Sequence, residues 1–230
     1  MKVLFIGDIH GLAEWEKIAK QGLLQFYKIV FLGDYVDSFF VKPGEQLHNL
    51  KNICEFARKY PDDVTLLLGN HDYAYIHGIT QITGYQHINA NEYRKIFDDN
   101  IDLFNIAWGY TNSTTKKYTL ATHAGLTESY YKHYLQAEMK EDELLHETLN
   151  RFKDNVDIMW KVGRVRGGRT VPGILWADYT EILDDPYSGI NQIFGHTPRP
   201  TVTVDQIGED IIACIDNWGN KKVVSLIFNL

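Results

Sequence analysis

The sequence is poor in cysteine, in long apolar runs and in net positive charge. Its two cysteines, Cys54 and Cys214, stand alone and form neither a disulfide framework nor a thiolate metal site. The apolar N-terminus is interrupted at Asp8 and His10, too early for a signal-peptide core, and no later segment is long enough for a membrane span. The net charge of −7 argues against nucleic acid as a partner held by bulk electrostatics. We therefore expect a soluble cytoplasmic protein without a membrane partner.

Short apolar runs alternate with segments of helical spacing in the first third of the chain. The runs "KVLFI", "KIVFL" and "VTLLL" are separated by "LAEWEKIAKQGLLQF" and "EQLHNLKNICEFARKY". Alternation of this kind predicts a parallel sheet, because parallel neighbours need a crossover connection. Later short runs predict a second, more antiparallel sheet; they are "KYTLATHAG", "NQIFGHT", "TVTVD", "IIACID" and "KVVSLIF".

The length of 230 residues is sufficient for one α/β domain with a substantial core. There is no repeat, low-complexity tract or obvious linker that would divide it. We therefore predict a single domain over residues 1–230, with helical or irregular insertions near 73–117 and 127–190.

Polar residues next to glycine follow five of the predicted strands. They are Asp8, His10, Asp34, Asp37, Asn70 and His71, followed later by His123 and His196. Each residue alone has an ordinary explanation as a helix cap, a turn residue or a surface histidine. Five strand ends that all carry such residues are harder to explain by packing, because functional groups in open α/β sheets gather at the carboxyl ends of the strands.

Oxygen and imidazole donors without thiolate favour manganese, iron or zinc in a hydrolytic centre. Two such ions, about 3.5–4 Å apart, need a carboxylate that bridges them. Asp34 lies in the middle of the series and is the predicted bridge. Asn70 can offer its amide oxygen to a metal, which leaves its neighbour His71 for proton transfer.

The motifs "GDIHG", "GDYVD", "GNHD", "HAGL" and "GHT" resemble, in this order, those of the calcineurin-like metallophosphoesterases. Because of "GDYVD", "HAGL" and "LWAD", the chain most resembles the serine/threonine phosphoprotein phosphatase branch, which includes phage phosphatases and symmetrical diadenosine tetraphosphatases. The resemblance extends from Lys2 to about Asp216. It implies an α/β fold in which two mixed β-sheets pack as a sandwich flanked by helices.

The resemblance also implies roles for individual residues. The first metal would be held by Asp8, His10 and Asp34, and the second by Asp34, Asn70, His123 and His196. His71 would act as the general acid, and Asp37 would orient it. The implied cofactors are two divalent ions, with manganese expected and iron or zinc as alternatives. A hydroxide bridging the metals would attack the phosphorus of a phosphorylated substrate, either a phosphoprotein or a nucleotide, in line with the leaving group.

Two positions depart from the phosphatase pattern. Phosphoprotein phosphatases continue "GDYVD" with Arg-Gly, whereas this chain has Ser38-Phe39, and Ala177-Asp178 replaces an arginine that phage enzymes carry after "LWA". The segment "RVRGGR" offers Arg166 and Arg169 as replacement phosphate ligands, since guanidinium binds phosphate oxygens in pairs. The alternative, with equal weight, is that this segment is a solvated basic loop.

Several functions remain open at this point. We expect a serine/threonine protein phosphatase-like phosphomonoesterase, with a symmetrical dinucleoside polyphosphate hydrolase as the alternative. For the latter, Tyr130, Tyr131, Trp160 and Trp176 offer rings for base stacking, although packing is the commoner role of such residues. A nuclease has only "RVRGGR" in its favour, and a non-catalytic metal-binding interaction module would have no need for His71. The substrate, the native metals and the oligomeric state are open.

Overall fold

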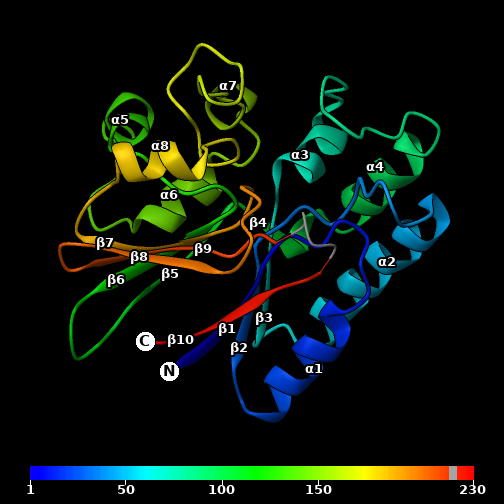
Figure 1. Cartoon of the computed structure of the whole chain (residues 1–230), viewed down its shortest axis with the longest axis horizontal. Helices are drawn as coiled ribbons and strands as arrows, with labels where there is room; N and C mark the ends of the chain where they lie inside the picture. Colours follow the sequence, from blue (N-terminus) through cyan, green and yellow to red (C-terminus); the bar gives the residue numbers. More distant parts are fainter. Residues whose placement is uncertain (218–221) are drawn as a thin grey trace.

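Two five-stranded sheets pack face to face in the computed structural model, which describes residues 1–217 and 222–230, and helices cover their outer sides (Figure 1). The first sheet has the order β10 (Ser225–Asn229), β1 (Lys2–Ile6), β2 (Lys28–Phe31), β3 (Val64–Leu67) and β4 (Phe104–Asn105). The second has the order β5 (Ala107–Thr111), β6 (Tyr118–Thr122), β7 (Ile190–Phe194), β9 (Asp210–Cys214) and β8 (Thr203–Ile207). The predicted α/β sandwich of two mixed sheets is confirmed.

The strands of the first sheet are apolar throughout because both of their faces are buried. In β1, Val3 and Phe5 join a core between the two sheets, to which Ile193 and Ala213 of the second sheet also belong. Leu4 and Ile6 point the other way, into the core beneath the helices. The alternation of a pleated strand thus fills two different cores from one continuous apolar run.

Helices α1 (Trp15–Leu24) and α2 (Pro43–Lys59) provide the crossovers between the parallel strands β1, β2 and β3. They lie on the outer side of the first sheet with α3 (Asn70–His77) and α4 (Ala90–Asp99), on the right in Figure 1. A short 3₁₀ turn over Ile101–Leu103 leads into β4.

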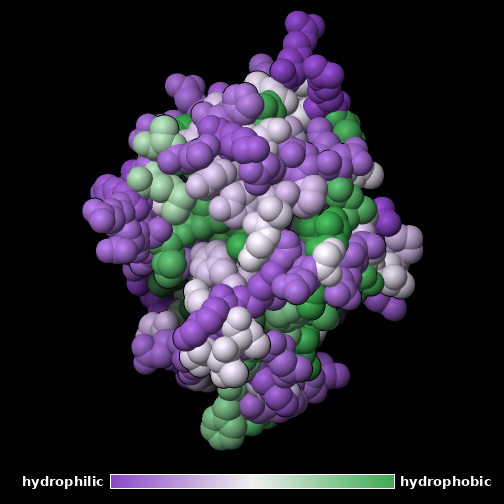
Figure 2. Space-filling view, turned by 90° about the vertical axis from the view of Figure 1, so that its left-hand side faces the viewer, coloured by the Kyte–Doolittle hydropathy of each residue, from purple (hydrophilic) through white to green (hydrophobic). Residues whose placement is uncertain are grey.

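The second sheet is covered by the chain between β6 and β7. This part contains α5 (Glu128–Tyr130), a π-helical turn (Tyr131–Leu135), α6 (Leu145–Arg151), α7 (Val156–Met159) and α8 (Tyr179–Asp184). Tyr179 and Ile182 of α8 pack with Phe194 and Ile212 on the outer face of this sheet. Figure 2, which faces the left-hand side of the molecule in Figure 1, shows hydrophilic residues over most of that surface, with hydrophobic ones in smaller areas between them.

The strand partners differ in part from those that the sequence pattern predicts. The last strand, grouped above with the second sheet, instead pairs antiparallel with β1 in the first sheet, with Lys2 opposite Asn229. Its apolar residues Leu226 and Phe228 pack against the core between the sheets, and a short apolar run does not encode which edge it joins. The second sheet is also less antiparallel than predicted, since β6–β7 and β7–β9 are parallel.

The region 73–117 contains β4 and β5 besides its helices, and these two strands were not predicted. Among the described residues, every helix is too short or too polar to cross a lipid bilayer.

Candidate active site

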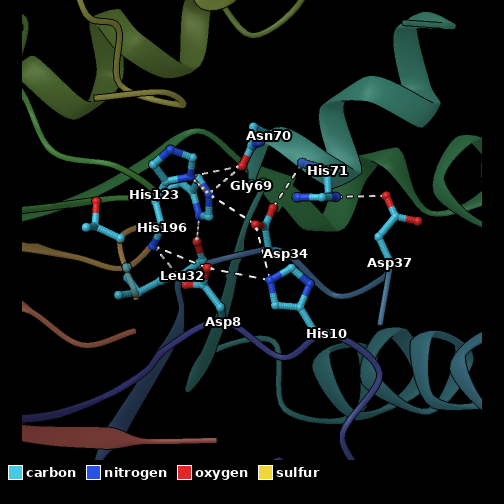
Figure 3. A network of polar contacts seen from close by, with 12 residues as sticks. Asp8, His10, Leu32, Asp34, Asp37, Gly69, Asn70, His71, His123 and His196 are labelled. Atoms are coloured by element: carbon cyan, nitrogen blue, oxygen red, sulfur yellow. Dashed lines mark hydrogen bonds and ion pairs between the residues drawn. The ribbon is translucent and has the colours of Figure 1, made fainter. Parts of the chain in front are cut away.

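The predicted metal ligands meet where the parallel strands of both sheets end (Figure 3). Asp8 and His10 follow β1, Asp34 follows β2, and Asn70 begins α3 directly after β3. The second sheet contributes His123 after β6 and His196 after β7. All six side chains are buried. Residues as far apart in the sequence as Asp8 and His196 are thereby brought into hydrogen-bonding contact.

The first group of donors consists of Asp8, His10 and Asp34. The Nδ1 atom of His10 donates a hydrogen bond of 2.8 Å to the carbonyl of Val36, so Nε2 faces the carboxylates. Nε2 lies 3.7 Å from Asp34 Oδ2 and 4.0 Å from Asp8 Oδ2. Burial lowers the pKa of His10 to about 4, which leaves the ring neutral and its Nε2 lone pair available near neutral pH.

The second group consists of Asp34, His123 and His196, with Asn70 beside them. The Nδ1 atom of His123 donates to the carbonyl of Leu32, and its Nε2 lies 2.9 Å from Asn70 Oδ1 and 3.4 Å from Asp34 Oδ2. His196 Nδ1 lies 3.1 Å from both Asn70 Oδ1 and His123 Nε2. Burial alone would lower the pKa of His123, but the Asp34 carboxylate raises it above its usual value. The Asp34 carboxylate therefore favours positive charge at His123, whereas burial and the charge of His123 lower the pKa of His196 well below its usual value.

Several carboxylates lie close together in the centre, and their negative charges repel one another. Burial raises the pKa of Asp8 well above its usual value, and the nearby carboxylates Asp216 and Asp34 raise it further. A bound divalent cation would offset both the burial and the repulsion. Together with the imidazoles of His10 and His196, whose pKa values burial lowers, this donor chemistry fits divalent metal ions, and these buried Asp and His groups are able to hold them.

Asp34 belongs to both groups of donors. Its Oδ2 faces His10 on one side and His123 on the other, while Oδ1 accepts a hydrogen bond of 3.0 Å from the backbone N–H of His71. One carboxylate between two sets of ligands is the arrangement that a bridging ligand requires.

The backbone of the centre is held in uncommon conformations. His10, Asp34, Asp37 and His196 all have positive φ, between 40° and 66°. Such conformations cost of order 1–3 kcal/mol each for residues other than glycine and persist where the surroundings enforce them. The strain therefore coincides with the predicted site.

Glycine at two positions lets the chain approach the carboxylates. A Cβ atom on Gly69 would lie 2.0 Å from Asp34 Oδ1, and one on Gly195 would lie 2.0 Å from Asp8 Oδ1. These contacts explain why glycine precedes Asn70 and His196.

His71 and Asp37 form a hydrogen-bonded pair at the edge of the centre (Figure 3). The Nδ1 atom of His71 lies 2.8 Å from Asp37 Oδ2 and donates to it. Burial lowers the pKa of His71, but Asp34 and Asp37 outweigh this effect and raise it. The imidazolium form is thus favoured, with Nδ1 held by Asp37, which is the state that a proton donor needs.

Two buried carboxylates at the site were not singled out by the sequence patterns. Asp72 accepts hydrogen bonds from the backbone N–H groups of Asp34, Tyr35 and Gly69, at 2.7, 2.9 and 2.9 Å. It is fully buried, and burial together with the Asp34 charge raises its pKa to about 8. Its position at the end of "GNHD" was the available signal. Asp216, two residues after β9, lines the same cavity as Asp34, and its position at the end of the run "IIACID" was the available signal.

A cavity of about 250 Å³ opens over the centre. Its floor includes His10, Asp34, Asn70, His71 and His196, and its walls include Phe39, Ile82, Arg166, Trp176 and Pro198. Phe39 thus lines the cavity in the segment where the phosphatase pattern has Arg-Gly.

The structure separates the two arginines that were expected to bind phosphate together. Arg166 lines the cavity, where its Nη2 atom donates to Thr197 Oγ1 at 3.0 Å and lies 3.1 Å from Asp178 Oδ2. Arg169 instead lines a different pocket, beside Glu181. The loop turns between them at Gly167, which has φ 82°, and the two side chains line different pockets.

The candidate stacking residues likewise differ in whether they line the cavity. Trp176 lines the cavity, and its ring contacts that of His196 at 5.6 Å between centroids. Tyr130 is fully buried and donates to the carbonyl of Ile158, which is a packing role. Trp160 packs against Trp176, and Tyr131 packs against Tyr187.

The sequence model of the calcineurin-like phosphoesterase family matches residues 1–219. No curated protein matches the chain. Among solved structures, a protein serine/threonine phosphatase from Saccharomyces cerevisiae, with similarity to human phosphatase PP5, superposes with a TM-score of 0.51. It is 14% identical, and the match covers 94% of this chain and 67% of that chain, which shows a shared fold.

Two further structures are less similar. A hypothetical protein from Pyrococcus horikoshii OT3 has a TM-score of 0.43 and 12% identity, over 98% of this chain and 86% of that one. An uncharacterised protein from Streptococcus pneumoniae TIGR4, a predicted phosphoesterase, has a TM-score of 0.33 and 7% identity, over 100% of this chain and 84% of that one. On the match of the family model to nearly its whole length, the chain belongs to the calcineurin-like phosphoesterase family and is a hydrolase of phosphate esters.

Proposed function

We propose that the protein hydrolyses phosphate monoesters with two divalent metal ions, as a serine/threonine protein phosphatase-like phosphomonoesterase. The observation that carries this proposal is the position of Asp34 between two groups of donors. Asp8 and His10 complete the first group, and Asn70, His123 and His196 complete the second. Two divalent ions bound there would supply the Lewis acidity that activates water and neutralises charge on the phosphoryl oxygens.

The residues around these ligands have the roles that the reaction needs. His71, held by Asp37, donates a proton from Nε2 to the leaving-group oxygen. Arg166 offers positive charge in the cavity wall, and its buried Nε atom has no hydrogen-bond partner within the described part of the chain. It takes the place of the arginine that Ser38 replaces, since a guanidinium group can pair with phosphoryl oxygens.

The size of the cavity favours a monoester. About 250 Å³ lies below the roughly 300–1,000 Å³ of sites that enclose a drug-sized ligand, so it suits one phosphoryl group and the adjoining part of the leaving group. A dinucleoside polyphosphate is the second candidate, because Arg166 and Trp176 line the same cavity and offer a phosphate contact and a ring. A non-catalytic module is disfavoured, since metal binding alone does not require the His71–Asp37 pair.

Metal content and turnover test this proposal together. We expect the purified protein to hold two divalent ions by elemental analysis and to hydrolyse p-nitrophenyl phosphate with manganese, and chelation should abolish turnover. Reconstitution with iron or zinc would identify the preferred ion. Bound metal without manganese-dependent turnover would favour the non-catalytic metal-binding module, and absence of both would refute the proposed function.

A substrate panel at equal enzyme concentration separates the candidate functions. It contains a phosphopeptide, diadenosine tetraphosphate, a cyclic nucleotide and single-stranded nucleic acid. We expect the highest kcat/KM with the phosphopeptide. A clear preference for diadenosine tetraphosphate would select the second candidate, and cleavage of the nucleic acid would select a nuclease.

A further inference from the structure

The carboxylate of Asp37 contacts a second side chain besides His71. Its Oδ2 accepts from His71 Nδ1 at 2.8 Å, and its Oδ1 accepts from the hydroxyl of Tyr75 at 2.5 Å. Asp37 and Tyr75 are each only 1% exposed. Each oxygen of the carboxylate therefore has its own partner, and the rotation of the carboxylate about its Cβ–Cγ bond is restrained from both sides.

Tyr75 is itself fixed in place. Its hydroxyl oxygen accepts a hydrogen bond of 2.8 Å from the backbone N–H of Gln86, so the hydroxyl proton is directed to Asp37. Its ring is stacked on Tyr85 at 4.5 Å between centroids and contacts Tyr93 at 5.0 Å. Burial and the Asp37 charge raise the pKa of Tyr75, so the hydroxyl stays protonated and remains a donor.

The backbone beside Asp37 is held by another residue. Gln46, fully buried in α2, accepts from Ser38 N at 3.0 Å and donates to Ser38 O at 3.1 Å. Asp37 itself has φ 66°, a conformation that such contacts stabilise. Gln46 thus secures the main chain, while Tyr75 contacts the carboxylate that faces His71.

We propose that Tyr75 is a positioning residue of the hydrolytic reaction, which holds the Asp37 carboxylate so that His71 points its Nε2 atom toward the leaving group. This inference rests on the proposed role of His71 as proton donor. A tyrosine serving only the core would need its ring alone, and phenylalanine would fill the same space. Here the hydroxyl joins a carboxylate at the cavity to the 78–89 connection between α3 and α4, in which Ile82 and Thr83 line the same cavity.

The substitution Tyr75→Phe tests the hydroxyl and keeps the ring. Tyr93→Phe is the matched control, because Tyr93 is equally buried in the same aromatic cluster and its hydroxyl approaches Pro43 O and Gln86 Oε1 at 3.4 Å. The substrates are p-nitrophenyl phosphate, whose leaving group needs little help from an acid, and phenyl phosphate, whose leaving group needs more. Bound metal and melting temperature are measured for every variant.

We expect Tyr75→Phe to lower kcat for phenyl phosphate about tenfold, part of the roughly 10²–10⁴ that general acid catalysis supplies. KM and bound metal should be unchanged, and the loss with p-nitrophenyl phosphate should be much smaller. Tyr93→Phe should alter neither rate. In a His71→Ala background, Tyr75→Phe should cause no further loss, because both changes remove the same contribution.

The outcomes separate this inference from the proposed function. If wild-type protein hydrolyses neither ester with manganese, the proposed function is wrong, and the inference falls with it. If wild-type protein is active but Tyr75→Phe behaves like Tyr93→Phe, only the inference is overturned. Equal losses with both esters, or a further loss in the His71→Ala background, would likewise show that Tyr75 does not act through His71.

Discussion

Replacement of Asp72 by alanine should show how strongly the candidate centre depends on one buried carboxylate. Asp72 is fully buried and accepts hydrogen bonds from three backbone N–H groups, those of Asp34, Tyr35 and Gly69. Alanine would leave all three donors buried without their partner. A buried donor left unsatisfied costs about 1–3 kcal/mol, so the three together cost roughly 3–9 kcal/mol.

Part of this cost is offset by relief of repulsion. Burial, and after it the Asp34 carboxylate, raise the pKa of Asp72 to about 8, which means that lost hydration and the neighbouring charge both oppose an ionised Asp72 when no cation is bound. We therefore expect a net loss of about 4 kcal/mol in the free energy of unfolding, near the lower end of that range. For a chain of this size, about 4 kcal/mol corresponds to a melting temperature lower by about 8–16 °C.

The assay is thermal and urea unfolding followed by circular dichroism, with and without manganese. Asp72→Asn should lower the free energy of unfolding by about half as much. Its amide oxygen can still accept hydrogen bonds in place of one carboxylate oxygen, while its NH₂ group faces the remaining backbone N–H as a second donor. The control is Asp63→Ala, since Asp63 is half-exposed and pairs with Lys28 at 2.8 Å on the surface. That pair should contribute less than about 1 kcal/mol. A loss at Asp72 no larger than that at Asp63 would refute the reasoning.

Three further predictions concern catalysis. Asn70→Ala should lower the metal occupancy measured by elemental analysis. His71→Ala should keep the metal and lower turnover by about 10²–10⁴, with a smaller loss for p-nitrophenyl phosphate. An equal loss for good and poor leaving groups would show that His71 is not the general acid. Asp37→Asn should move the alkaline limb of the kcat profile to lower pH, because His71 must be protonated and Asp37 raises its pKa; an unmoved limb would contradict this role. Arg166→Ala should raise KM about 10–100-fold, because Arg166 lines the cavity. The control Arg169→Ala should leave KM unchanged, because Arg169 lines a different pocket. Equal effects on KM would show that the loop as a whole, and not the Arg166 side chain in the cavity, determines substrate binding.

The alternation of the first three strands with helices and the positions of polar residues at strand ends could be predicted from the sequence, because both follow from local pattern. Runs such as "KVLFI" are apolar at every position since both faces are buried, and the residue after each run reaches the same edge. The pairing of β10 with β1 could not be predicted in this way, because the partner of a short edge strand depends on distant contacts.

The same limit applies within the site. Asp72 stands at the end of "GNHD", but its role depends on the backbone N–H groups of Asp34 and Tyr35, which a different part of the chain supplies. Arg166 and Arg169 look equivalent in "RVRGGR", and only the turn at Gly167 directs them to different pockets. Tyr75 reads as an ordinary core residue of a helix, and its contact with Asp37 becomes visible only in three dimensions.

The donors of the centre come from both sheets, which has a consequence for how the protein matures. On the ribosome, Asp8, His10, Asp34 and Asn70 emerge with strands β1, β2 and β3 of the first sheet, well before His123 and His196 of the second sheet and before β10, which completes the first. A nascent chain that has only these four donor residues presents part of a ligand set, and it should hold a cation weakly. Tight capture then requires that the two sheets have already packed together, so the ion would be loaded onto finished molecules and would in turn hold the sheets against separation.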